Sequence, residues 1–302
     1  DLQLRNIYYQ TFGSTSNIDQ LVVDKKYSFF NPKAGLNYDI NQKNKIYFSL
    51  SKAHREPTRS DFENNINIQP EELIDYELGW KYNTEKFSFN SNLYYMGYKN
   101  QLVLTGALDD VGSPIRENSG KSYRMGIELE SVYKATNKLN ISANISLSEN
   151  KNVDYKTNYN GVITDWGDTD ISFSPNIISS AVIQFSASQD LTFILLNKFV
   201  GNQYMSNTES NISKLSSYST TDLNILYTIE NSALWMFGSA YFSEIIVTAM
   251  INNIFNKEYV SNGYYYTYDD TWSDPNLITT IEGTGYYPQA KRNFLLGLTF
   301  KL

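Results

Sequence analysis

The stretch of this chain best equipped to bind a ligand is an aromatic and acidic run between 262 and 272. Aromatic rings stack on flat or multi-ring ligands, and neighbouring carboxylate and amide groups supply hydrogen bonds, as in many loop sites. The segment 151–171 has a similar make-up. The same rings could instead pack loops together or lie at a membrane interface. The residues expected to contact a ligand are Tyr264, Tyr265, Tyr266, Tyr268, Trp272, Trp166 and Tyr159.

A second group with binding chemistry is charged. Arg55, Glu56 and Arg59 lie within five residues of one another. They could contact a ligand, or form exposed ion pairs worth under about 1 kcal/mol each. Glu128 and Glu130 would face the same side of a strand. Paired carboxylates can do acid–base chemistry, but we expect a structural pairing here, so we predict no catalytic residue and no enzyme.

Metal and redox chemistry have little support in the sequence. The chain has no cysteine, which excludes disulfides, thiolate zinc sites and iron–sulfur clusters. His54 is the only histidine, and a lone histidine cannot form a metal site by itself. The acidic residues of 151–171 lack the Asp-x-Asp-x-Asp-Gly register of a calcium loop. We therefore predict no metal site and no cofactor.

The elements that must position these residues are strands, and the clearest is the last. From Asn293 to Leu302 the chain alternates between large apolar residues and smaller or polar ones, with Leu295 as the exception. Because successive side chains of a strand point to opposite faces, one face is wholly apolar. An apolar outer face and a polar inner face are typical of a transmembrane β-barrel.

Composition agrees with that interpretation. The chain has 302 residues, of which 41% are hydrophobic, yet no apolar run approaches the roughly 18 residues that a membrane helix requires. Only helices and closed barrels satisfy their backbone hydrogen bonds in lipid, so a membrane-spanning chain of this kind must be a barrel. Aromatic residues reach 15%, enough for interfacial girdles and binding loops. The net charge of -7 argues against a nucleic-acid partner.

Eleven strand-like segments follow one another along the chain, several with a clear period of two. Short polar turns and long connections alternate between them, as expected for a barrel with turns on one rim and extracellular loops on the other. Residues 1–9 resemble the tail of an earlier strand, and we expect 10–32 to form a loop. The segments are 33–40, 44–54, 72–82, 86–105, 116–134, 138–150, 172–185, 190–202, 217–229, 243–252 and 292–302.

One connection departs from this alternation. Residues 230–242 should form a short turn but are rich in apolar and aromatic residues. They could be an insertion lying on the membrane interface, or they could extend both flanking strands, which is the interpretation we favour.

Five motifs then resemble those of one family, in the family's order across residues 49–302. They are a serine-rich strand running into Arg-x-Pro, a Pro-Glu segment followed by Glu-x-Gly, an Asn-x-Gly…Gly-x-Glu strand, an Asn-x-Phe-Asn-Lys-x-Tyr segment, and a Pro-Gln…Arg-x-Phe lead-in to the last strand. This set resembles TonB-dependent outer-membrane receptors of the Bacteroidetes type. The motifs occupy Ser49–Thr58, Ile68–Gly79, Asn118–Glu128, Asn252–Tyr259 and Tyr287–Phe294.

The resemblance implies an all-β fold, a 22-stranded antiparallel barrel, of which 1–302 would be the C-terminal portion with eleven or twelve strands. It implies a plug domain and an energy-coupling segment that these residues do not include. It also implies a protein of the bacterial outer membrane that imports a scarce large nutrient, driven by TonB. A ferric siderophore is favoured, with haem, cobalamin or oligosaccharide as alternatives.

The expected partners are the TonB complex, outer-membrane lipid, the nutrient and a surface lipoprotein. A different interpretation is a passive or structural barrel that serves as a scaffold in a surface complex; a soluble all-β binding module is a third.

Overall fold

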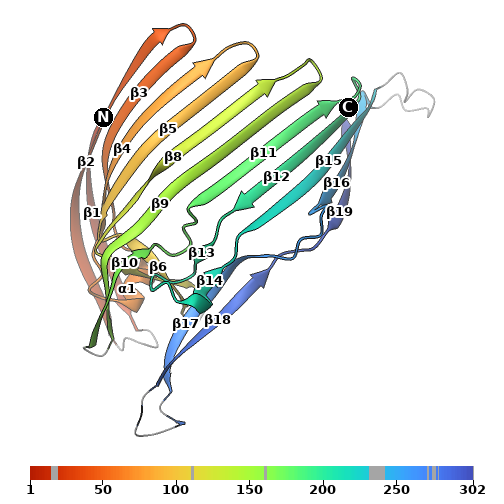
Figure 1. The fold of residues 1–302 in the computed structure, drawn as a ribbon. Coiled ribbons are helices and arrows are strands. Elements are labelled where there is room, and N and C mark those ends of the chain that lie inside the picture. The colour runs from red at the N-terminus through yellow and green to blue at the C-terminus, as the bar shows by residue number, and fades with distance from the viewer. Residues whose placement is uncertain are drawn as a thin grey trace.

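The structure is a computed structural model that describes residues 1–14, 20–109, 112–159, 162–230, 242–270, 272–273, 277 and 279–301. Its main feature is one curved antiparallel sheet in which twelve strands follow one another as hydrogen-bonded neighbours (Figure 1). In the described residues the two outermost strands are not paired with each other. The strands in order are β1 (Leu2–Gly13), β2 (Leu21–Asn41), β3 (Asn44–Arg55), β4 (Glu71–Asn83), β5 (Phe87–Lys99), β8 (Lys121–Lys134), β9 (Leu139–Tyr159), β11 (Ile177–Ser186), β12 (Leu191–Val200), β15 (Tyr218–Glu230), β16 (Glu244–Asn252) and β19 (Asn293–Lys301).

The remaining elements belong to the long connections. β10 (Val162–Asp170) pairs only with β9, and three further pairs of strands form separate hairpins. None of the helices in the described part is long and apolar enough to cross a membrane. The other elements are α1 (Arg59–Asn64), β6 (Leu102–Leu108), β7 (Pro114–Asn118), β13 (Gln203–Tyr204), η1 (Asn211–Ser213), β14 (Lys214–Leu215), β17 (Val260–Asp270) and β18 (Thr279–Pro288).

The expected strand pattern is confirmed. Each of the eleven expected segments overlaps a strand of the large sheet, and residues 2–9 lie in β1, the twelfth strand. The short turns after β2, β4, β8 and β11 join neighbouring strands directly, whereas the connections at the other ends carry the hairpins and α1. The all-β architecture and the alternation of loop lengths therefore follow the sequence.

The expected loop over 10–32 is wrong. β1 runs to Gly13 and β2 begins at Leu21, and the two pair from Leu2↔Pro32 to Gly13↔Leu21. Leu21 and Val23 are fully buried. A hairpin that extends beyond the membrane needs no continuous apolar face, so the polar run 24–26 hid this strand from a search for alternating apolar residues.

Two other expected strands, 86–105 and 116–134, are each divided. The chain leaves the sheet at Asn100 (φ 54°) and returns at Gly120 (φ 77°), and the Asn100 N–H donates to the Gly120 carbonyl over 2.5 Å. Between these points β6 and β7 form a hairpin of their own.

The expected apolar segment 230–242 lies almost wholly outside the described residues, so the choice between an insertion and extended strands stays a prediction.

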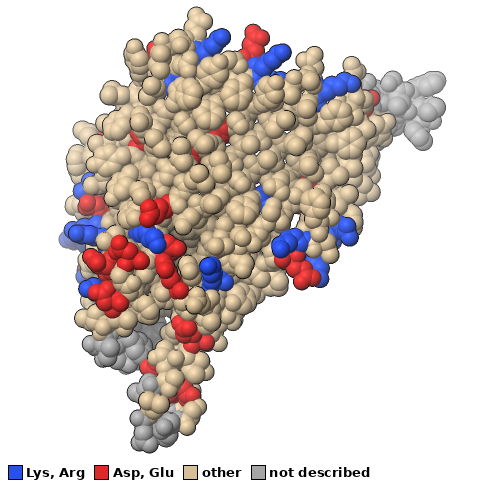
Figure 2. Space-filling view, in the orientation of Figure 1, with Lys and Arg blue, Asp and Glu red and all other residues tan. Residues whose placement is uncertain are grey.

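The two faces of the sheet differ as the alternation requires. On one face Leu298 and Phe300 of β19 lie opposite Val247 and Ile245 of β16, and on the other face Lys301 contacts Glu244 at 3.1 Å. Leu296 is 75% exposed on the apolar face. Figure 2 shows few charged atoms across the middle of the face seen there, while charges gather toward its two ends. This is the distribution that lipid around the middle of a barrel wall demands.

Aromatic side chains gather next to the short turns. Trp80 and Phe89 have ring centroids 5.5 Å apart, and the ring of Phe87 lies 6.4 Å from that of Tyr133. The Trp80 indole N–H also donates to Asn44 Oδ1 over 3.1 Å. Rings with one apolar body and one polar edge are suited to the membrane–water interface, so this group marks the level where the bilayer ends.

The long connections pack against one another at the opposite end. We call α1, β6–β7, β13–β14 with η1, and β17–β18 the roof. On one side β7 contacts α1 through Arg116 and Asp61, 3.7 Å apart. On the other side the Leu104 carbonyl accepts hydrogen bonds from Ser172 (2.5 Å) and Asn207 (2.9 Å). The β6–β7 hairpin thus contacts both flanks of the roof.

In the part of the chain that the structure describes, the roof has two small apolar cores and a partly buried polar link. The cores comprise Leu21, Val23, Phe62, Ile68 and Leu102 on the α1 side, and Met205, Leu215 and Tyr265 on the other side. The link joins β7 to β9, because the Tyr155 hydroxyl donates to the Glu117 carboxyl. Burial raises the pKa of Glu117 above its ordinary value of 4.5.

We predict that Leu298→Arg destabilises the inserted protein by about 2–4 kcal/mol, because it places a charge against lipid near mid-strand. Thr299→Arg should cost far less, because the neighbouring side chain points to the polar face. The measurement is the free energy of unfolding from lipid vesicles, with surface levels compared in cells. Equal losses from the two substitutions would contradict the assignment of the faces.

We also predict that the attachment of the β6–β7 hairpin weakens as pH rises. Because the pKa of Glu117 is raised in the folded protein, its protonated carboxyl stabilises the attached hairpin fully below about pH 4.5. This stabilisation is lost as the pH rises through the folded pKa. Hydrogen exchange of the β6–β7 amides, corrected for its intrinsic pH dependence, should therefore accelerate with pH. Glu117→Gln keeps an acceptor for Tyr155 without a charge and should remove this dependence; an unchanged profile would refute the prediction.

Candidate functional site

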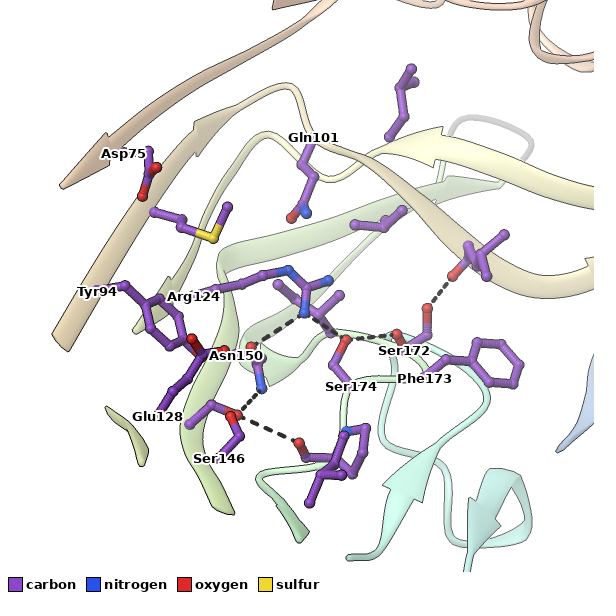
Figure 3. A pocket seen from close by; sticks show the side chains of 18 of the residues that line it. Asp75, Tyr94, Gln101, Arg124, Glu128, Ser146, Asn150, Ser172, Phe173 and Ser174 are labelled. Carbon is purple, nitrogen blue, oxygen red and sulfur yellow. Dashed lines mark hydrogen bonds between the residues drawn. The ribbon is translucent and has the colours of Figure 1, made fainter. Parts of the chain in front are cut away.

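A cavity of about 530 Å³ lies where the roof meets the sheet. One side is the wall, formed by polar side chains of β4, β5, β8 and β9, and the other is the start of β6 with the connector 171–175 (Figure 3). The wall residues come from the face opposite the lipid-facing side chains, because Glu128 pairs with Ser146 and Asn92 in the same layer. The cavity is therefore on the concave side of the sheet, which we call the lumen.

Three acidic side chains lie on the wall of this cavity. Asp75, Glu77 and Glu128 line it, together with the polar side chains of Asn92 and Tyr94. None of the three carboxylates takes part in an ion pair within the described residues, and Asp75 Oδ1 is buried without a hydrogen-bond partner there. Glu130 lies further along β8 and lines a neighbouring cavity. The expectation that Glu128 and Glu130 share one face is thus confirmed.

The wall also carries a guanidinium group, at the end of the cavity beneath the roof. Arg124 of β8 donates from Nη1 to Asn150 Oδ1 (3.2 Å) and to Ser174 Oγ (2.8 Å). Figure 3 shows these bonds, with Gln101 above Arg124 and Ser172 beside Ser174. This arrangement of donors and acceptors can bind a polar ligand. In the part of the chain that the structure describes, no group of three or more His, Asp and Glu side chains could hold a metal ion.

The predicted rim residues form separate ion pairs instead of one cluster. Arg55 contacts Glu71 at 3.2 Å, Arg59 contacts Glu63 at 2.6 Å, and Glu56 contacts Arg5. Arg55 also donates to the Leu102 carbonyl, which ties the end of β3 to the roof. The structure does not bring Arg55, Glu56 and Arg59 together on one ligand surface.

His54 lies where β2 and β3 separate, since their register ends at Lys33↔Ser51. Its ring stacks on Phe29 with centroids 4.8 Å apart, and its nitrogens contact Asn31 (2.7 Å) and Glu72 (3.2 Å). The His54 side chain therefore joins β3 to residues of β2 and β4.

The aromatic run at 262–272 is mostly a strand, β17, and not a loop. Consecutive tyrosines therefore point to opposite faces of the β17–β18 hairpin. Tyr264, Tyr266 and Tyr268 form a stacked row on one face, with centroids 6.2 and 6.4 Å apart. We call them the tyrosine row. Their rings lie over the opposite strand, where a Cβ on Gly283 would come within 2.4 Å of the Tyr266 ring.

Tyr265 faces the other way. It is 7% exposed and packs in the roof core with Met205 and Leu215. Its hydroxyl donates to Glu282 over 2.6 Å, and burial together with that carboxylate raises the pKa of Tyr265 to about 12. Tyr265 is therefore positioned to hold the roof and is separated from the tyrosine row.

The other expected contact residues are dispersed. Trp272 is 80% exposed. Trp166 lies on β10 and donates from its indole nitrogen to Thr157 Oγ1 over 3.0 Å. The backbone of Tyr159 pairs with Val162, but its side chain is outside the described residues. No ring contact in the described part of the chain joins Trp166 to the tyrosine row.

Sequence reasoning did not single out Arg124 or the connector 171–175. A signal for Arg124 was present, because it lies two and four residues before Gly126 and Glu128 and so shares their lumen-facing side. The connector gave none, since its approach to Arg124 depends on contacts between residues 50 positions apart.

Comparison with known proteins places this geometry in a family. The family model described as "TonB dependent receptor-like, beta-barrel" matches residues 1–254. No curated protein sequence matches. The siderophore receptor PiuA from Acinetobacter baumannii has a similar fold, with a TM-score of 0.67, 17% identity, and coverage of 95% of this chain and 38% of PiuA.

Two further structures are similar. The copper transporter OprC gives a TM-score of 0.66 at 16% identity, covering 92% of this chain and 40% of OprC. The ferric yersiniabactin uptake receptor FyuA from Yersinia pestis gives 0.62 at 16% identity, covering 96% and 40%. The chain thus spans about two fifths of the length of these proteins. With its family model matched over most of the chain and its fold similar to those of the three structures above, this chain belongs to the TonB-dependent receptor family of the bacterial outer membrane.

Proposed function

We propose that this chain is the C-terminal part of the barrel of a receptor that imports a scarce nutrient across the outer membrane, driven by TonB. A ferric siderophore is the cargo we favour. The plug domain that would occlude the lumen is expected in the rest of the receptor. In this proposal the chain's own task is ligand capture, since transport moves the cargo without making or breaking its covalent bonds.

The observation that carries the proposal is the cavity between the roof and the lumen wall. Its volume of about 530 Å³ lies within the range of roughly 300–1,000 Å³ of small-molecule sites. It is lined from both the wall and the roof, so a ligand there would contact both. The family match and the siderophore receptors among the similar structures support iron-complex import as the activity.

The partners in this proposal are the TonB energy-coupling complex, outer-membrane lipid and the nutrient. A surface lipoprotein is a further candidate partner at the exposed roof. The tyrosine row lies on the face of the β17–β18 hairpin opposite Tyr265, with Tyr266 and Tyr268 exposed and Tyr264 partly buried, and we assign it to ligand or partner contact.

The proposed function predicts a growth phenotype. Removing the full-length receptor from its host should abolish growth on at least one ferric siderophore as the sole iron source, and restoring it should restore growth. Uptake of radiolabelled iron should stop when TonB is removed or the proton gradient is collapsed. Uptake that persists without TonB would support a passive barrel instead.

The tyrosine row yields a separate prediction. Replacing Tyr264, Tyr266 and Tyr268 by alanine should weaken capture of the imported complex by one or more powers of ten, because each aromatic contact contributes about 0.5–1.5 kcal/mol beyond area burial. The measurement is the affinity of the detergent-purified receptor for that complex. Surface levels of the wild type and the variant in cells should be equal.

Tyr265→Phe is the matched control for the row. It keeps the ring but removes the bond to Glu282, so it should lower roof stability and leave affinity unchanged. Unaltered affinity in the triple variant would remove the tyrosine row from the binding site.

A further inference from the structure

The cavity beneath the roof is charged asymmetrically. Among the described residues that line it, Asp75, Glu77 and Glu128 are acidic and Arg124 alone is basic, and all four belong to strands of the wall. Arg124 has no ion-pair partner among the described residues, although Asp75, Glu77 and Glu128 line the same cavity. A partly buried guanidinium without a counter-ion is unfavourable unless something else compensates its charge.

The structure fixes the direction in which Arg124 offers its donors. Both bonds from Nη1 go to neutral acceptors, Asn150 on β9 and Ser174 on the connector. A guanidinium has five N–H donors in a planar fork. These two bonds and an interaction with the Tyr98 hydroxyl, which is also a neutral partner, leave the remaining donors of the fork available. In Figure 3 the guanidinium group extends among Gln101, Asn150 and Ser174, away from Asp75 and Glu128. The group is therefore held in place by neutral partners and is not neutralised.

The polar groups next to Arg124 already make some hydrogen bonds within the protein. Gln101 accepts a hydrogen bond from Ser122 through Oε1 at 2.6 Å, which orients its amide group. Ser172 donates to the Leu104 carbonyl, so its oxygen can still accept. The end of the cavity next to the connector 171–175 thus offers donors from Arg124 and Gln101, whereas Asp75, Glu77 and Glu128 offer carboxylate acceptors elsewhere on the wall. A ligand that spans both would need an anionic group at one end and no negative charge at the other.

We propose that Arg124 is the specificity-determining residue of this cavity and binds a carboxylate of the imported complex, the remainder of which is neutral or cationic. The inference rests on the proposed function, since it takes this cavity as the capture site. It names the ligand class: an iron complex with one free carboxylate, such as a carboxylate-bearing ferric trihydroxamate. Polyanionic complexes such as a ferric tricatecholate are disfavoured, because the three wall carboxylates would repel them.

The test uses the purified full-length receptor and two matched probes. One is a ferric trihydroxamate with a free carboxylate, and the other is its methyl ester; a ferric tricatecholate is a third probe. The wild type should bind the acid about 10- to 100-fold more tightly than the ester, as expected for a hydrogen bond to a charged group. Arg124→Gln should reduce that preference to near unity while changing affinity for the ester little.

Two further variants make the test specific. Arg124→Lys should keep part of the preference, because lysine supplies a point charge without the planar fork. Lys121→Gln is the matched control: this lysine lies on the same strand, exposed on the opposite face, and its loss should leave the preference intact.

Each outcome separates this inference from the proposed function. Equal binding of acid and ester by the wild type, or tightest binding of the tricatecholate, would overturn the role of Arg124 and leave iron import standing. An equal loss of affinity for the acid and the ester in Arg124→Gln would also overturn it. Arg124 would then only position Asn150 and Ser174. Failure to bind or import any ferric complex would overturn the proposed function itself. If Arg124→Gln does not reach the membrane, the wild-type probe preference and Arg124→Lys still decide.

Discussion

The part of this protein that crosses the membrane depends on one constraint, which is that lipid offers no partner to a backbone N–H or C=O group. The antiparallel ladder from β1 to β19 satisfies these groups within the sheet. A paired strand must alternate its side chains between two faces, so lipid and lumen each receive every second residue. The apolar face of β19 and the carboxylates of the lumen wall are therefore two consequences of one ladder.

Outside the bilayer the backbone no longer has to form all its hydrogen bonds within the sheet, and the architecture changes there. β2 and β9 have 21 residues each, about twice the roughly 9–11 that cross a bilayer. Beyond the bilayer, water can satisfy backbone groups, so the chain can leave the sheet, as it does at Asn100. The roof is then held by side chains: two small apolar cores, the ion pair of Arg116 with Asp61, and the partly buried link of Glu117 with Tyr155.

The same boundary explains how much could be predicted from the sequence. Strands inside the membrane were found because the period of two is imposed on every residue, as in the segment 138–150. The sequence did not predict the hairpin of β1 and β2, because the part of it beyond the bilayer need not alternate apolar and polar residues. The predicted strand 86–105 is too long for a related reason. Its last residues belong to β6, which is a strand but pairs with β7 and not with a strand of the large sheet. The five motifs allowed the family to be predicted from the sequence, and the family model confirms it over residues 1–254, which include the first three motifs.

The candidate site was predicted less well, and the tyrosines show why. On a flexible loop, Tyr264, Tyr265 and Tyr266 could all turn toward one ligand, which is what the sequence suggested. On a strand they cannot, because the pleat sends Tyr265 into the roof core and the other two to the exposed face. Arg124 is the opposite case: its position on β8 already sends it into the lumen, but its chemical state depends on Asn150 and Ser174. A strand period can place a side chain on a face, whereas only the packing of distant segments determines whether its charge is already neutralised. The chemistry of the candidate site therefore depends on contacts between the regular wall and the irregular roof, and sequence periodicity alone does not predict those contacts.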